Sequence, residues 1–111
     1  MGVDKNKIAL YGSSAGGNIA IGALKIMTSQ KKSSGVQLLI LMQPMLNDYI
    51  YKTPVDKLNL AEKVYHNTIK DCYKFLSPDF KAQENNTLLF PGKMSSKELL
   101  DLPPTVIITS E

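Results

Sequence analysis

The chain has 111 residues, enough for one modest domain, and its 43% hydrophobic and 21% charged residues are ordinary for a globular protein. All thirteen basic residues are lysines, so the net charge of +3 comes without the bidentate recognition of phosphate or guanine that arginine provides. These lysines are scattered, which argues against a nucleic-acid-binding protein. The longest apolar run, Leu38 to Met42, is too short for a transmembrane segment.

The first predicted elements are a strand, a tight turn and a helix. Residues 8–11, Ile-Ala-Leu-Tyr, form an apolar tetrad that is typical of a strand buried on both faces. Gly-Ser-Ser-Ala-Gly follows at 12–16, and an apolar helix is predicted over 19–27. A G-x-S-x-G pattern between a strand and a helix is typical of a nucleophile elbow, which places its serine at the apex of a sharp turn. Ser14 is therefore predicted to be the nucleophile of a serine hydrolase.

The residues around Ser14 fit the chemistry of such a turn. Gly12 and Gly16 are expected because the backbones of strand and helix nearly touch there, and Gly17 is grouped with them as a structural residue of the elbow. The helix after Ser14 directs N–H groups and the positive end of its dipole at the reacting centre, so the N–H of Ala15 is a predicted oxyanion donor. The alternatives are a phosphate-binding turn or a purely structural one. No lysine follows in the G-x-x-x-x-G-K-[ST] pattern, which disfavours phosphate.

The helix over 19–27 is apolar almost all round. Its polar positions Asn18, Gly22, Lys25 and Ser29 are predicted to form one narrow exposed stripe. A second apolar strand is predicted over 36–42, which completes a right-handed βαβ unit of a parallel sheet. A helix buried this deeply implies more surrounding protein than 111 residues supply.

A helical segment is predicted to connect this unit to the next strand. Its main helix runs from about residue 58 to 76, where apolar residues recur at steps of three and four. Asp56 is a candidate N-cap, and the Ser-Pro pair at 77–78 ends the helix. The buried side is predicted to carry Tyr65 and Ile69, with His66 on the opposite, solvated side.

The remaining predicted elements are short. Residues 88–92 are expected to form a loop that packs one apolar patch. Ser95 and Glu98 form a capping box for a short helix that ends near Leu100. A third strand, β-branched throughout, is predicted over 105–109.

Other reactive side chains receive structural interpretations. A triad in the order Ser…Asp…His would use His66 as its base and Asp48 or Asp56 as its acid. His66 lies on the predicted polar side of the helix over about 58–76, however, and this position favours a solvated histidine over a catalytic one. Cys72 is predicted to be an inert buried thiol, and as the sole cysteine it allows no internal disulfide, which favours a reducing compartment such as the cytoplasm. No metal cluster or nucleotide motif appears, so the predicted chemistry uses no metal and no cofactor.

The sequence resembles the α/β-hydrolases of the hormone-sensitive-lipase-like group, the fold-3 family of carboxylesterases. The likeness rests on residues 2–4 leading into 8–11, and on 12–18, 38–44 and 102–111. It implies a partial α/β-hydrolase fold, with three parallel strands, a buried helix after the elbow and a helical cap-type segment. One incomplete domain would comprise strand–elbow–helix–strand (1–44), the cap-like segment (45–101) and the third core strand (102–111).

By this resemblance Ser14 is the nucleophile and the Ala15 N–H an oxyanion donor in a short-chain, lipase-like carboxylesterase. The family usually has an acidic residue where this chain has Ser13. Its His-Gly-Gly-Gly loop, triad acid and triad histidine have no counterpart here, so the chain is expected to need the remainder of the hydrolase domain and to be inactive alone. An ester is the implied substrate. A non-catalytic interaction module, and an amidase or peptidase on the same fold, stay open as alternatives.

Overall fold

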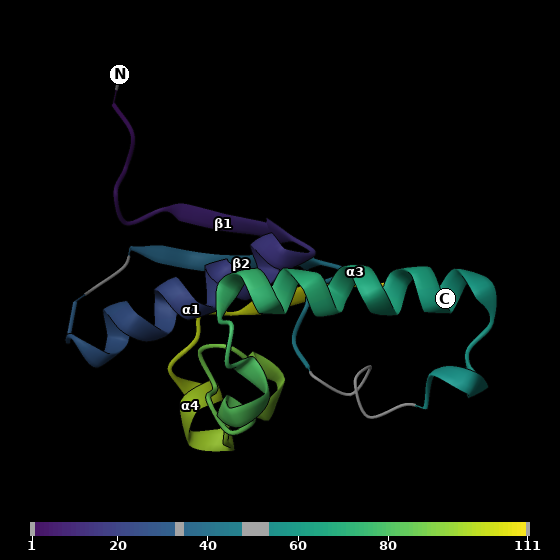
Figure 1. Cartoon of the computed structure of the whole chain (residues 1–111). Helices are drawn as coiled ribbons and strands as arrows, with labels where there is room; N and C mark the ends of the chain where they lie inside the picture. The colour runs from purple at the N-terminus through teal and green to yellow at the C-terminus, as the bar shows by residue number, and fades with distance from the viewer. Residues whose placement is uncertain (1, 33–34, 48–53, 111) are drawn as a thin grey trace.

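The computed structural model describes residues 2–32, 35–47 and 54–110. Its centre is a parallel three-stranded sheet in the order β1-β2-β3 (Figure 1), formed by Ile8–Ser13, Val36–Met42 and Thr105–Ile108. Helix α1, Ala15–Ser29, connects β1 to β2 and packs on the sheet. The strands agree with the predicted ranges to within two residues, and parallel pairing confirms the predicted α/β class.

The prediction that residues 8–11 are buried on both faces is wrong. Ile8 and Tyr11 of β1 are 36% and 55% exposed, whereas Leu39 and Leu41 of the central strand β2 are buried. β1 lies at one edge of the sheet and pairs only with β2, and β3 at the other edge is exposed along its length. The apolar run therefore predicted the strand correctly, but it did not predict how many faces of the strand the described residues cover.

Helix α1 is buried on one side only, so the predicted burial on nearly all sides is wrong. Ile19 and Ile26 are 60% and 44% exposed. The predicted polar stripe is also wrong, because Asn18 is buried and Lys25 is half-buried. The side of α1 that faces the sheet joins β2 and one loop residue in the first core cluster: Ala20, Ile21, Leu24, Leu39, Leu41 and Met94.

Helix α3, Leu60–Leu76, is the main helix of the connecting segment and reaches beyond the sheet in Figure 1. Its N-cap is Asn59 in a capping box with Glu62, not the predicted Asp56. Asp56 lies in the short 3-10 helix η1, Val55–Lys57. Ser77 is the C-cap, as the Ser-Pro pair predicted.

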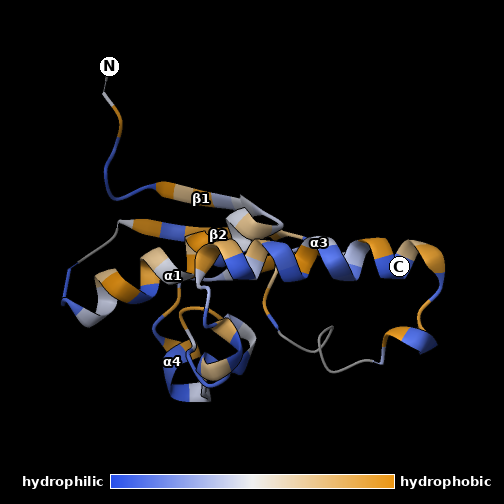
Figure 2. Ribbon diagram, in the orientation of Figure 1, coloured by the Kyte–Doolittle hydropathy of each residue, from blue (hydrophilic) through white to orange (hydrophobic). Residues whose placement is uncertain are grey.

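The buried side of α3 also differs from the prediction. His66 and Tyr73 are buried, and Tyr65 is 55% exposed. The prediction that His66 is solvated is therefore wrong. The Tyr73 ring packs on the rings of Phe80 and Phe90, with centroids 6.2 and 4.9 Å away. Figure 2 shows that apolar residues recur along the length of α3. Their spacing alone therefore did not identify which side of the helix is buried. These aromatic contacts set the rotation of the helix.

Three short elements lie between α3 and β3: η2 (Phe80–Gln83), η3 (Pro91–Lys93) and α4 (Ser96–Leu100). The loop over 88–92 buries Leu89, Phe90 and Pro91 as predicted, although Leu88 is exposed, and Ser95 forms the predicted capping box with Glu98. Residues of α3, of η2, of the loop before η3 and of the segment after β2 form the second core cluster: Met45, Ile69, Tyr73, Phe80, Leu89 and Phe90.

The buried amide of Asn18 joins the two core clusters. Its Nδ2 donates to the carbonyl oxygens of Met45 at 3.1 Å and Leu89 at 2.8 Å. Both acceptors belong to the second cluster, whereas Asn18 lies on α1, which carries part of the first. The amide therefore ties two loops to the first turns of α1.

Replacement of Asn18 by alanine removes the donor from two buried carbonyl oxygens, which costs about 1–3 kcal/mol. We expect Asn18→Ala to lower the free energy of unfolding by that amount in urea denaturation. Asn67→Ala, at an exposed asparagine of α3, is the matched control and should change it by less than about 0.5 kcal/mol. Equal effects of the two substitutions would contradict the bridging role of Asn18.

A polar cluster joins α1 to α4. The Nζ of Lys25 lies 2.5 Å from Oε1 of Glu98 and also donates to the hydroxyl of Thr87. The Thr87 hydroxyl donates to the same carboxylate oxygen at 3.0 Å, and the N–H and hydroxyl of Ser95 donate to the other. The ammonium group of Lys25, followed by the donors of Ser95 and Thr87, lowers the pKa of Glu98 from 4.5 to about 2.

This carboxylate is expected to make stability depend on pH. A lowered pKa in the folded chain means that ionised Glu98 stabilises the fold above about pH 4.5, and that this contribution is lost as the pH falls toward 2. Glu98→Gln should therefore lower the urea midpoint at pH 7, and the difference between its midpoint and that of the parent chain should shrink as the pH falls. Asp56→Asn, at an exposed aspartate of η1, is the control and should follow the parent chain throughout. A Glu98→Gln deficit that stays constant from pH 7 to pH 3 would exclude this role.

Candidate active site

Ser14 occupies the turn between β1 and α1 with φ 51° and ψ −120°, a conformation that residues other than glycine rarely adopt. Its N–H donates to the carbonyl of Met42 at 2.9 Å. Its own carbonyl accepts from the N–H groups of Gly17 and Met45, each at 3.0 Å. The end of β2 and the residues after it thus hold the turn, and Ser14 stays exposed.

Backbone segments approach closely on either side of this turn. A Cβ added at Gly12 would lie 2.5 Å from the carbonyl oxygen of Gly16 and 2.8 Å from the Cα of Gly17. A Cβ added at Gly17 would lie 2.7 Å from the Cβ of Pro44. The backbone of Gly16 takes part in the close approach, but a Cβ added at Gly16 would have nothing within 4 Å, so the steric need for a second glycine falls at Gly17 instead.

This difference separates the glycines by experiment. Gly12→Ala is expected to lower the free energy of unfolding by about 1–3 kcal/mol, because the added methyl group collides with backbone that cannot rotate away. Gly16→Ala is the matched control and should leave stability unchanged or raise it by up to about 1 kcal/mol, since alanine favours a helix. Urea denaturation of both variants measures the difference. A Gly12→Ala variant as stable as Gly16→Ala would contradict the close approach.

The N-terminus of α1 supplies hydrogen-bond donors beside Ser14. Ala15 is the first residue of this 15-residue helix, and the first N–H groups of an α-helix have no carbonyl partner within it. The first turn of α1 contains no acidic residue that would compete for them. The positive end of the helix dipole lies at the same place. An oxygen atom bound next to Ser14 would therefore meet both a donor and a favourable potential.

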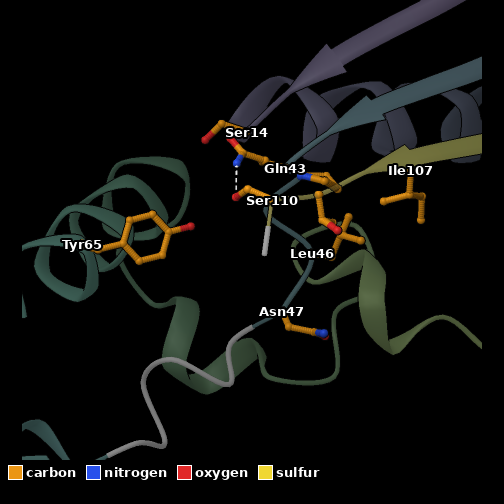
Figure 3. Close-up of a pocket in the computed structure, with 9 residues that line it drawn as sticks. Ser14, Gln43, Leu46, Asn47, Tyr65, Ile107 and Ser110 are labelled. Carbon is orange, nitrogen blue, oxygen red and sulfur yellow. Dashed lines mark hydrogen bonds between the residues drawn. The ribbon is translucent and has the colours of Figure 1, made fainter. Parts of the chain in front are cut away.

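A pocket of about 540 Å³ at the carboxyl ends of β2 and β3 contains Ser14 (Figure 3). Open α/β sheets bind their ligands at this end of the strands. The lining comes from the elbow, the residues after β2, helix α3 and the end of β3: Ser14, Gln43, Pro44, Leu46, Asn47, Tyr65, Ile107, Thr109 and Ser110.

The polar residues that share this pocket with Ser14, among them Gln43 and Tyr65, were not predicted as site residues from the sequence. Gln43 directly follows a predicted parallel strand, and that position alone could have identified it. Tyr65 could not be identified, because it was assigned to the buried side of α3.

Gln43 joins the ends of β2 and β3. It has a positive φ of 44°, and its N–H donates to the carbonyl of Ile108 at 2.8 Å. Its Nε2 donates to the hydroxyl of Ser110 at 2.6 Å, and Figure 3 shows this amide between Ser14 and Ser110. The amide is thereby held in the wall of the pocket.

The alternative triad within the chain is not assembled by the described residues. His66 is buried on α3, and neither it nor Asp56 lines the Ser14 pocket. Asp48 lies outside the described residues. Cys72 is half-buried against the second core cluster.

The described residues contain neither a candidate metal site nor a membrane-spanning helix. No group of three His, Cys, Asp or Glu side chains could hold a metal ion in residues 2–32, 35–47 and 54–110. In the same ranges, no helix is long and apolar enough to cross a membrane.

A parallel sheet, a strained serine where a strand turns into a helix, and a pocket at the carboxyl ends of the strands together define an α/β-hydrolase. The family model for the alpha/beta hydrolase fold matches residues 1–111, and the chain belongs to this family. No curated protein sequence matches the chain.

Two solved structures share the fold with a TM-score of 0.70 each. One is carboxyl esterase 2 from the mycorrhizal fungus Tuber melanosporum, at 22% identity, and the other is a mutant of the esterase rPPE in complex with (S)-Ac-CPA, at 23% identity. The matches cover 99% of this chain but 36% and 34% of those proteins. The chain therefore spans about a third of their length.

Proposed function

We propose that the protein is a serine hydrolase that cleaves short carboxylic esters through an acyl-enzyme on Ser14. The observation that carries the proposal is the exposed Ser14 at a strained turn, in the lining of a pocket and beside the N-terminus of α1. Backbone strain of this kind persists where the surrounding structure enforces it, and it is concentrated at functional sites. The two esterases that share the fold support an ester as the substrate.

In the proposed reaction the Oγ of Ser14 attacks the ester carbonyl carbon while a histidine base takes its proton. The carbonyl oxygen becomes an oxyanion, to which the N–H of Ala15 donates a hydrogen bond. Collapse of the intermediate breaks the bond to the alkoxy group, which leaves with the proton from the base. Water then attacks the acyl-enzyme in the same way and releases the acid.

The base and its partner acid are assigned to the remainder of the hydrolase domain, as the family resemblance implies. The described residues support this assignment, since the sole histidine is buried away from the pocket lining. Without a base the serine hydroxyl is a poor nucleophile, and loss of triad members costs about 10⁴ to 10⁶ in rate. We therefore expect the 111-residue chain by itself to be nearly inactive.

A fluorophosphonate probe tests the proposal, because an activated serine attacks its phosphorus and expels fluoride. Mass spectrometry should find the label on Ser14 in the complete product of the gene and not in the 111-residue chain alone. Ser14→Ala should abolish the label and lower ester hydrolysis by about 10⁴-fold or more. Ser13→Ala, at the adjacent exposed serine, is the matched control and should retain both the label on Ser14 and the rate of ester hydrolysis.

Two outcomes would overturn parts of this proposal. No label on Ser14 in the complete gene product would favour a non-catalytic module that keeps the elbow as a scaffold. Labelling together with faster cleavage of an amide than of the matched ester would favour an amidase or peptidase.

A further inference from the structure

Tyr65 extends from α3 into the pocket that contains Ser14. In Figure 3 its hydroxyl points from the helix toward the ends of the strands, where Ser14, Gln43 and Ser110 lie. The side chain is 55% exposed, and its hydroxyl forms no hydrogen bond with another described residue. A phenol hydroxyl directed into a pocket is an available donor to a bound molecule.

The two sides of the pocket differ in polarity. Leu46 and Ile107 lie on the side away from Tyr65 in Figure 3, and they form an apolar wall. The groups nearer Tyr65 are hydroxyls and an amide, and the amide of Gln43 is already held by Ser110. A ligand at Ser14 thus meets an apolar surface on one side and the hydroxyl of Tyr65 on the other.

We propose that Tyr65 determines specificity by donating a hydrogen bond to an uncharged acceptor atom, such as an ether or keto oxygen, near the scissile ester of the substrate. This inference rests on the proposed esterase function and narrows its substrates to acceptor-bearing esters over purely alkyl ones. A site that offers a hydrogen bond disfavours the analogue without the acceptor, because its own polar group is then left unpaired.

Two pairs of esters, in which one oxygen atom replaces one methylene group, test this inference on the complete gene product. p-Nitrophenyl methoxyacetate and butanoate place the acceptor in the acyl part. 2-Methoxyethyl acetate and butyl acetate place it in the alcohol part. For each pair, the kcat/KM value of the acceptor-bearing ester is divided by that of the alkyl ester. This ratio is then divided by the corresponding ratio of alkaline hydrolysis rates, which removes the difference in intrinsic reactivity.

Tyr65→Phe keeps the ring and removes only the donor. We expect it to lower the normalised preference for the acceptor in one of the two pairs by about 3- to 10-fold, the effect of one neutral hydrogen bond. A merely structural role for Tyr65 would slow both members of a pair together and leave the ratio unchanged. The pair that responds identifies which side of the ester faces α3.

Tyr11→Phe is the matched control. Tyr11 has the same exposed fraction of 55%, and its hydroxyl donates to the Sδ of Met42 at 3.4 Å on β2, outside the pocket. This substitution should leave both ratios unchanged.

Failure of this inference can be told apart from failure of the esterase proposal. If Ser14 is labelled by the fluorophosphonate and the esters are cleaved, but Tyr65→Phe changes neither ratio, the role of Tyr65 is refuted and the esterase stands. If Ser14 is not labelled and no ester is cleaved, both proposals are refuted.

Discussion

A close approach of three backbone segments at the Ser14 turn is the constraint on which the rest of the structure depends. The end of β1, the first turn of α1 and the segment after β2 meet at Gly12, Gly17 and Pro44, at distances that leave no room for a Cβ on either glycine. This packing lets the carbonyl of Ser14 accept from Met45, beyond the end of β2. The position of the serine is thus set by a neighbouring strand as much as by its own turn.

The same region connects the sheet to α3. Asn18, one turn along α1 from Ser14, donates to the carbonyls of Met45 and Leu89, which belong to the cluster that packs around Tyr73. Tyr73 fixes the rotation of α3, and that rotation directs Tyr65 into the pocket. A continuous set of packed and hydrogen-bonded groups therefore runs from the candidate nucleophile to the residue that we propose determines specificity.

Local patterns predicted what depends on neighbouring residues in the chain. The strands, the Ser95 capping box and the end of α3 at Ser77 follow from a few adjacent residues each, and the structure contains all of them. One error is local, since Asn59 and not Asp56 is the N-cap of α3, and the others concern contacts between distant segments. Asn18 has a polar side chain yet is buried, because two loop carbonyls accept from it, and no spacing within α1 reveals those partners. His66 and Tyr65 exchanged their predicted sides for the same reason, since residues outside α3 decide which side is covered.

Backbone strain is concentrated at the pocket, and the sheet itself maintains it. Among the described residues other than glycine, Ser14, Lys31 and Gln43 have positive φ, and two of these three line the pocket. Such conformations cost about 1–3 kcal/mol each and persist only where the surrounding structure enforces them. Ser14, after β1, donates its N–H to the last residue of β2, and Gln43, after β2, donates to the last residue of β3. β2 thus fixes Ser14, which follows β1, and β3 fixes Gln43, which follows β2. The register of the parallel sheet therefore determines how these two residues are placed in the pocket.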